Sequence, residues 1–506
     1  FARRLADSDE GNLNYQFDVT VNLEDVAAMK LKSGDGPGAL AAYTESLDIR
    51  RRLAETDKTD PKWQQNISVT LEKIGDLKQG QNDAPGALAV YEDMLGNNRK
   101  LAAADPDNAN RKRDVAVSLE RIGKVKLNAG DSAGALAAYE EGLGIRRKLA
   151  ESEPANELYR QELSTTIERV GDIKRDLGDA AGVLSAYQEM LILDRAVAAA
   201  NIGDTKRQRV VSIDLNKIAD VKLAAGDTDG ALAAVSESLN IARNVAVIAP
   251  DNIDLQRDIS VSLERLGNVK LNVGDKPGAL SAFEEMLSID RRAYKADSAN
   301  TQRQREVLVS LNKVGDLRLG LNDTSAALAD YEEGLGIARQ LAQANESDAK
   351  AQRNVANSLD KVGDAKAKSG DKPGALASFD ESLAIRRKIA EGDKSNYQWK
   401  REVSLTLDRI GNTKFDSDDV KGSVAAFEES LAIARELADA VKDSIEAQTD
   451  LVVSLYKLAK VSAGEEKETA IGEGLKLLAA LDADGKLTKD QKGWGDAFRS
   501  LRSGSQ

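Results

Sequence analysis

The sequence predicts an all-α solenoid built from antiparallel helix pairs, and three observations support this prediction. Aspartates recur every 48 residues without insertion or deletion, at Asp35, Asp83, Asp131, Asp179, Asp227, Asp275, Asp323, Asp371 and Asp419. Each aspartate lies between two segments whose apolar residues recur at three- and four-residue spacing, as in amphipathic helices. No Pro-rich, Ser-rich or charge-rich linker interrupts the chain. A fixed period of this length indicates stacked units that bury a core only against their neighbours.

The composition suits thin stacked helices and excludes several partners. Of the 506 residues, 31% are charged and 4% are aromatic, so Leu, Ile, Val and Ala must form most of the core. The formal net charge of −13 argues against nucleic acid or an anionic membrane, because both favour clustered Lys and Arg. A basic or neutral protein or peptide is the better match. No apolar stretch is long enough to span a membrane, and no hydrophobic signal core is visible.

The residue types also argue against catalysis. The chain has no Cys and no His, which removes disulfides, thiol chemistry, the usual zinc ligands and every His-dependent triad. No phosphate-binding Gly-rich loop, zinc-protease motif or nucleophile elbow occurs. We therefore predict no enzymatic activity, no cofactor and no metal site. Redox chemistry does not identify the compartment, and the cytoplasm is only slightly favoured.

The first helix of each unit, helix A, is exemplified by residues 61 to 80. Ile67, Val69, Leu71, Ile74 and Leu77 form its expected apolar face. Gly75 interrupts this helix at a cost of about 1 kcal/mol relative to Ala. Only small residues occupy this position in the other units, namely Gly123, Gly171, Gly267, Gly315, Gly363, Gly411, Ala27, Ala219 and Ala459. A cost repeated so often implies that another helix crosses closely there.

The second helix, helix B, begins at the recurring aspartate. Asp83 is a good N-cap, and Pro85 falls in the first turn, where a missing N–H is harmless. Ala87, Leu88, Tyr91 and Leu95 then form one apolar face. Two helices of about twenty residues at 1.5 Å rise are rods about 30 Å long, which leaves only short loops.

These residues resemble the tetratricopeptide repeat (TPR) signature, with small Gly75, then Ala87 and Tyr91, preceded by Leu71 and Ile74. The same spacing occurs at Gly123, Ala135 and Tyr139, and at Gly267, Ala279 and Phe283. The usual TPR period is about 34 residues, so this chain is more similar to the long-period TPR arrays of some bacterial signalling proteins. The resemblance implies a right-handed superhelix that binds proteins without catalysis, along a concave groove lined mainly by helix A.

The repeat divides the chain into three parts. Residues 1–12 are expected to be the tail of a truncated preceding repeat, because Phe1 aligns with Ile49. Residues 13–451 form nine repeats, and residues 452–506 form a degenerate tenth repeat with a C-terminal capping helix. Thr488 and Gln491 have the spacing of a capping box for that last helix. We therefore expect a fragment or processed product of a larger protein.

Two charged registers on helix B repeat as faithfully as the apolar ones. One consists of Arg51, Arg99, Arg147, Arg195, Arg243, Arg291, Arg339, Arg387 and Arg435; an acidic register, from Glu45 to Glu429, lies six residues earlier. Six residues do not bring side chains together within one helix, so we predict ion pairs between repeats. A third register, Lys30 to Lys414 on helix A, allows two interpretations. In the first, the aliphatic parts of the lysine side chains pack between helices and their ammonium groups stay in water. In the second, the lysines form a basic track that binds a phosphate or an acidic peptide.

The candidate partner-binding residues are acidic and lie on helix A. Positions three before and one after the small residue share one face, and they supply Glu72, Asp76, Glu120, Glu168, Asp172, Asp220, Glu264, Asp316, Asp360 and Asp364. The resemblance places this face in the groove. TPR proteins that clamp chaperone tails carry Lys and Asn there, so this sequence argues against that ligand. We predict recognition of a basic or neutral peptide or protein.

Residues that break the repetition are a second kind of candidate. Trp63, Tyr159 and Trp399 share a register near the start of helix A. They either anchor a partner as exposed aromatics or cover helix ends in the loops. An alternative for the whole chain is a structural protein that self-associates head to tail into filaments. The degenerate tenth repeat argues against this alternative, since a cap blocks growth.

Overall fold

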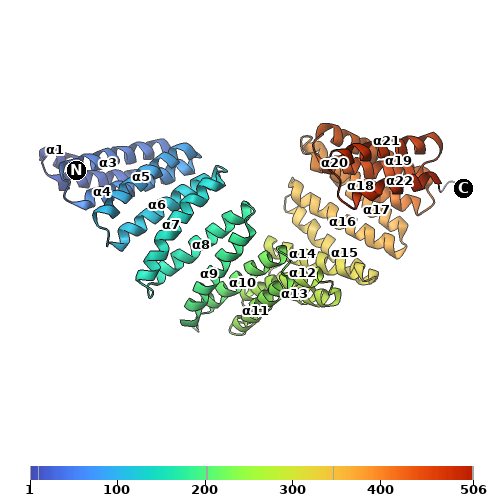
Figure 1. Cartoon of the computed structure of the whole chain (residues 1–506), viewed down its shortest axis with the longest axis horizontal. Coiled ribbons are helices and arrows are strands. Elements are labelled where there is room, and N and C mark those ends of the chain that lie inside the picture. The colour runs from blue at the N-terminus through green and yellow to red at the C-terminus, as the bar shows by residue number, and fades with distance from the viewer. Residues whose placement is uncertain (1, 10, 201–202, 346, 504–506) are drawn as a thin grey trace. The chain divides into compact units, whose positions relative to one another are not determined.

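The computed structural model describes residues 2–9, 11–200, 203–345 and 347–503, and every regular element in these ranges is a helix (Figure 1). The helices A are α2 (Leu13–Lys32), α4 (Pro61–Gly80), α6 (Ala109–Asn128), α8 (Glu157–Asp176), α10 (Thr205–Ala224), α12 (Ile253–Asn272), α14 (Thr301–Gly320), α16 (Ala349–Ser369) and α18 (Tyr397–Phe415). The helices B are α3 (Gly36–Thr56), α5 (Ala84–Ala104), α7 (Ser132–Ser152), α9 (Ala180–Ala200), α11 (Thr228–Ala246), α13 (Lys276–Ala296), α15 (Thr324–Gln343), α17 (Lys372–Gly392) and α19 (Val420–Ala440).

Further helices lie at both ends of these pairs. α1 (Ala2–Ser8) precedes them, and they are followed by α20 (Ile445–Val461), α21 (Gly464–Ala483), the short 3-10 helix η1 (Gln491–Gly493) and α22 (Trp494–Ser503). Consecutive helices pack as antiparallel pairs, which confirms the predicted all-α, TPR-like fold. The predicted terminal segments include Phe1 and residues 504–506, which lie outside the described residues.

Contacts divide the chain into two compact units, Phe1–Ala249 with α1 to α11 and Pro250–Gln506 with α12 to α22. Within each unit, every α-helix packs on the next α-helix of the chain. The first unit has a core that includes Ala27, Tyr43, Leu71 and Tyr91. Each repeat therefore completes the core of its neighbour, as expected for stacked units.

The C-terminal segment departs from the predicted division at one point. The expected boundary between residues 451 and 452 falls inside α20, which begins at Ile445 after the N-cap Ser444. The predicted capping box does form. The amide of Thr488 donates to Gln491 Oε1 (2.9 Å), and the amide of Gln491 donates to Thr488 Oγ1 (3.3 Å). This capping box spans the start of η1, and α22 then buries Phe498 against α21.

The recurring aspartate caps helix B and also clamps the preceding turn. Asp83 Oδ1 accepts a hydrogen bond from the amide of Gly86 (2.9 Å), and Oδ2 accepts one from Lys78 Nζ (2.8 Å). These bonds, the lysine bond foremost, lower the pKa of Asp83 below its ordinary value. Asn82, just before the cap, has a φ of 60°, a left-handed conformation that Gly adopts in most of the other turns.

Seven of the nine cations of the lysine register on helix A are engaged in ion pairs. Lys30, Lys78, Lys222 and Lys270 each pair with the cap aspartate five residues later. Lys174, Arg318 and Lys366 pair with a glutamate of the preceding helix B. These pairs favour the first interpretation of the register, a structural one, over a basic track for a ligand, which stays a prediction.

The small residue of helix A lies against the aromatic ring of helix B, as the sequence predicts. A Cβ atom at Gly75 would stand 2.4 Å from Cε1 of Tyr91, and the same close approach recurs at Gly267 with Phe283 (2.2 Å). Tyr91 and Phe283 are fully buried. The glycine register is therefore a steric requirement that sets how closely the two helices of a pair approach.

Gly315→Leu is expected to lower the free energy of unfolding by about 2 kcal/mol, because overpacking displaces a buried ring. A Cβ there would stand 2.6 Å from Cε1 of Tyr331. Urea denaturation followed by circular dichroism measures the loss. The control is Gly336→Ala on α15, where nothing lies within 4 Å. It should stabilise the protein by about 1 kcal/mol through helix propensity. Equal losses at both positions would contradict the steric explanation.

The predicted ion pairs between helices B are confirmed. Arg51 reaches Asp93 (3.4 Å), Arg99 reaches Glu141 (2.5 Å) and Arg195 reaches Glu237 (2.5 Å), each 42 residues ahead. The ladder continues with Arg3–Glu45, Arg147–Glu189, Arg291–Glu333, Arg339–Glu381, Arg387–Glu429 and Arg435–Glu473. Each pair is about half exposed, so it contributes at most about 1 kcal/mol.

Candidate functional site

The predicted acidic residues lie on helix A, and cations engage them. Arg121 on α6 pairs with Glu72 (2.8 Å) and Asp76 (3.4 Å) on α4. Further pairs join helices A of successive repeats, namely Glu24–Lys73, Glu168–Lys217, Glu264–Lys313, Asp316–Lys361, Asp360–Arg409, Asp364–Arg409 and Asp408–Lys457. These pairs neutralise much of the predicted acidic character of the face.

The remaining predicted carboxylates have partners closer in the chain. Glu120 pairs with Arg146 of α7 (2.6 Å), and Asp172 pairs with Arg175 of its own helix (2.8 Å). Asp220 and Lys217 both line a small hollow formed by residues of α8, α9 and α10. Whether any of these residues contacts a partner stays a prediction.

Tyrosine hydroxyls bind part of the same acidic set. Tyr91 donates to Asp76 (2.5 Å), Tyr187 to Asp172 (2.7 Å) and Tyr331 to Asp316 (2.6 Å). Burial first, and then the hydrogen bond to a carboxylate, raises the pKa of each tyrosine above its ordinary value. The aromatic residue that packs on Gly thus also positions an aspartate at the surface.

A second ladder on helix A was missed from the sequence. It consists of Arg113–Glu162, Arg257–Glu306, Arg353–Glu402 and Arg401–Asp450, each 49 residues apart. An arginine followed by an acidic residue one period plus one position later was a detectable pattern. Only knowledge of how successive repeats are staggered would have assigned these residues to each other.

A row of mostly apolar side chains runs between the two ladders of helix A; it is called the apolar row below, although Thr165 and Asn357 interrupt it. Its members lie three or four residues from each ladder, so they share the same face. In the first unit they are Val21, Val69, Val117, Thr165 and Ile213; in the second unit they are Val261, Val309, Asn357, Leu405 and Val453. Val69 was expected in the core but is 41% exposed. Three- and four-residue spacing alone did not separate the buried edge of the helix from its solvent edge.

The aromatic candidates divide into two kinds. Trp63 and Tyr159 are buried, so they do not present their rings to a partner and instead cover helix ends. The ring of Trp63 packs edge-on against Phe17 at 5.6 Å between centroids. Trp399 is partly buried and lines a hollow of about 980 Å³ beside α16 and α17. Of the three, Trp399 is the one that remains accessible.

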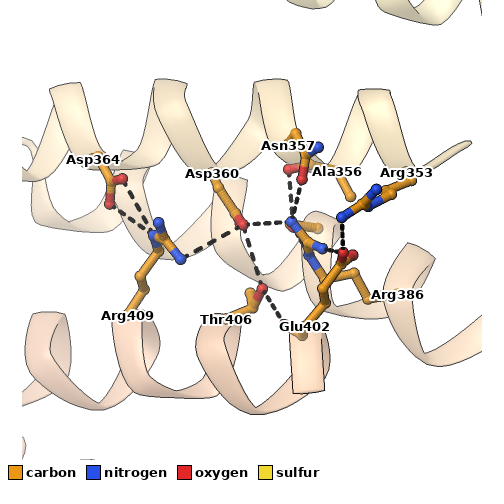
Figure 2. A network of polar contacts seen from close by, with 10 residues as sticks. Arg353, Ala356, Asn357, Asp360, Asp364, Arg386, Glu402, Thr406 and Arg409 are labelled. Carbon is orange, nitrogen blue, oxygen red and sulfur yellow. Dashed lines mark hydrogen bonds and ion pairs between the residues drawn. The ribbon is translucent and has the colours of Figure 1, made fainter. Parts of the chain in front are cut away.

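Beneath the apolar row, polar side chains of helix B form a buried floor. Figure 2 shows the network around Arg386 of α17. Its guanidinium pairs with Asp360 (2.8 Å) and Glu402, and donates to Asn357 Oδ1 (2.7 Å). Arg353 shares Glu402, and Arg409 joins Asp360 to Asp364. Arg386 is only 5% exposed, so this network joins three helices inside the protein.

The floor of α9 and α10 carries two neighbouring carboxyl groups instead. Asp194 lies at the register of Arg386, and Asp214 lies where Thr406 stands in Figure 2. Burial, and then the charge of Asp194, raises the pKa of Asp214 to about 8. Asp194 accepts a hydrogen bond from Ser164 (2.7 Å). At neutral pH, the pair of Asp194 and Asp214 therefore retains a proton in the folded protein.

The described residues contain no group of three or more His, Cys, Asp or Glu placed to hold a metal ion. None of the helices in the described ranges combines the length and the apolar character needed to cross a membrane.

No protein-family model matches this sequence, and no curated protein matches it. Solved structures share the helical-repeat layout. RapI in its apo form has 11% identity and a TM-score of 0.46, with 83% of this chain and 98% of that chain covered. BtubC from P. vanneervenii has 19% identity and a TM-score of 0.40, with 50% of this chain and 90% of that chain covered. The C-terminal part of a TPR repeat-containing protein from Cytophaga hutchinsonii has 15% identity and a TM-score of 0.38, with 65% of this chain and 97% of that chain covered. Similarities at this level support no inference about activity.

Proposed function

We propose that this chain is a non-catalytic scaffold that binds a protein or peptide along the face of its helices A. The observation that carries the proposal is the apolar row, in which Val69, Ile213, Val309 and Leu405 expose about two fifths of their surface at corresponding positions. Apolar side chains aligned on one face and bordered by polar groups are typical of a protein-binding surface.

The ladders on either side of the row supply specificity. Their carboxylates, including Glu72, Glu168 and Glu264, are shared with Lys or Arg of the next repeat. A partner with apolar residues for the row and polar groups for the rims complements this face. The predicted preference for a basic or neutral partner then rests on the net charge of −13 rather than on free carboxylates.

The row can be tested by pulldown from lysate of the source cell. The variant carries Val69→Asp, Val117→Asp and Ile213→Asp, and its matched control carries Ile192→Asp on helix B, where the side chain is 68% exposed. A partner captured by the intact chain should be lost from the row variant and kept by the control. Circular dichroism verifies that both variants are folded. Equal capture by all three proteins would refute the role of the row.

A second variant addresses the acidic residues separately. Changing Glu72, Asp76, Glu168 and Asp172 to Lys reverses the charge of one ladder and disrupts its ion pairs. Loss of the partner from this variant, with retention by the row variant, would assign recognition to charge rather than to apolar contact.

A further inference from the structure

The buried floor contains a recurring binding site for a guanidinium group. Arg50 pairs with Glu24 (2.7 Å) and donates to Thr70 Oγ1 (2.6 Å). Arg146 pairs with Glu120 (2.6 Å) and donates to Thr166. In both cases the carboxylate lies 26 residues before the arginine, and the hydroxyl lies 20 residues after it.

Arg386 completes the pattern. Its carboxylates are Asp360, 26 residues before, and Glu402, 16 residues after. We call the residues at these three positions, 26 before, 16 after and 20 after, the guanidinium cradle. Three repeats thus hold an internal arginine in the same way.

On α13 the cradle is retained but the arginine is absent. The register carries Asp290, and the cradle positions carry Glu264, Glu306 and Ser310. Asp290 accepts hydrogen bonds from Ser260 (2.7 Å) and from Ser310, and it is 5% exposed. Burial raises its pKa, whereas the two serine hydroxyls lower it. A carboxyl group thus replaces the cation that the cradle holds elsewhere.

The site is also hollow. A cavity of about 220 Å³ between α12 and α14 is lined by Asp290, Glu264, Glu306 and Ser310 together with Val261 and Val309 of the apolar row. The two valines place the cavity at the face proposed above to bind a partner. A side chain extending from that partner would meet the cradle at the base of the cavity.

Cations of the protein already pair with two carboxylates that line the cavity. Glu306 pairs with Arg257 (2.6 Å) and Arg303 (2.8 Å), Glu264 pairs with Lys313 (3.2 Å), and Arg305 also lines the cavity. In the filled cradle, Arg353 and Arg386 share Glu402 in the same manner. Glu306 thus already carries two guanidinium groups, as Glu402 does, so a further guanidinium would bind chiefly to Asp290, which accepts hydrogen bonds from two serines.

We propose that the cavity at Asp290 binds an arginine side chain of the partner, whose guanidinium takes the place that Arg50, Arg146 and Arg386 occupy in the other repeats. The planar fork of arginine suits several carboxyl and hydroxyl acceptors better than the single ammonium of lysine. This inference rests on the proposed function, because the arginine belongs to a polypeptide that lies along the helix A face.

The test uses N-acetyl-arginine methylamide as the probe and its citrulline analogue as the neutral control, titrated calorimetrically into the full chain. All proteins carry Asp194→Asn, so that the other aspartate at this register does not contribute. Asp290→Asn removes the charge, and Asn98, buried at the same register on α5, indicates that asparagine fits. Asp290→Arg fills the cradle from within. Asp48→Arg, at an exposed position of α3, is the control that changes the net charge by the same amount as Asp290→Arg.

The arginine probe should bind in the millimolar range and at least about tenfold more tightly than the citrulline probe. Asp290→Asn and Asp290→Arg should each weaken binding by about tenfold or more, and Asp48→Arg should leave it unchanged. Absence of arginine binding, equal binding of both probes, or binding unaffected by Asp290→Asn would overturn the proposal. The probe binds without a protein partner, so this result is separate from the pulldown that tests the scaffold.

Discussion

Asp214→Thr is expected to stabilise the protein by an amount that increases with pH, reaching the order of 5 kcal/mol at pH 9. Burial and the neighbouring Asp194 raise the pKa of Asp214 to about 8. The unfolded chain releases this proton near pH 4, whereas the folded protein keeps it. The buried carboxyl group therefore costs no stability through its ionisation below pH 4. As the pH rises from 4 towards 8, the free energy of unfolding falls progressively. Threonine removes this loss, and Thr166 and Thr406 already occupy the same register.

Urea denaturation at pH 4.5, 7 and 9 measures the effect. The groups that face Asp214 are Asp194 of α9, Glu168 of α8 and Lys217 of α10. The control, Asp48→Thr, lies at an exposed position and should change stability little at any pH. A gain of the same size at all three pH values would show that packing, rather than the buried charge, is responsible.

Arg386→Met is expected to lower the free energy of unfolding by about 3 kcal/mol. Truncating a buried ion pair leaves the opposite charges buried without their partner. Here Asp360 would keep Arg409, and Glu402 would keep Arg353, so the loss falls at the lower end of the usual range.

Arg387→Met is the matched control, because the adjacent arginine pairs with Glu429 at the surface. Its loss should be below about 1 kcal/mol, and added salt should reduce it further. Denaturation of both variants, with and without salt, measures the difference. Equal losses would mean that the network in Figure 2 adds nothing beyond a surface pair.

The elements could be predicted because their signals are local. Asp83 identifies the start of a helix through its own cap, and Gly75 with Tyr91 identifies the crossing within one pair. The helix B ladder was predictable in principle because two opposite charges repeat with one period. Arg99 and Glu141 meet as expected.

The candidate face was only partly predictable. The acidic register was recognised, but its neutralisation by Arg121 and Lys217 was missed, as was the exposure of Val69. Helical periodicity states which residues share a side of one helix. It does not state which side faces the next helix A, because that depends on the angle between repeats.

The sequence by itself determined the repeat, the length and caps of its helices and the small residue where they cross, because each depends on residues within one unit. Only the tertiary structure decided which registers of successive repeats meet. Glu306 lies 49 residues from Arg257 and 16 from Asp290, and neither separation is a helical spacing. The stagger and twist between neighbouring units bring these residues together, and the cavity at Asp290 exists for the same reason.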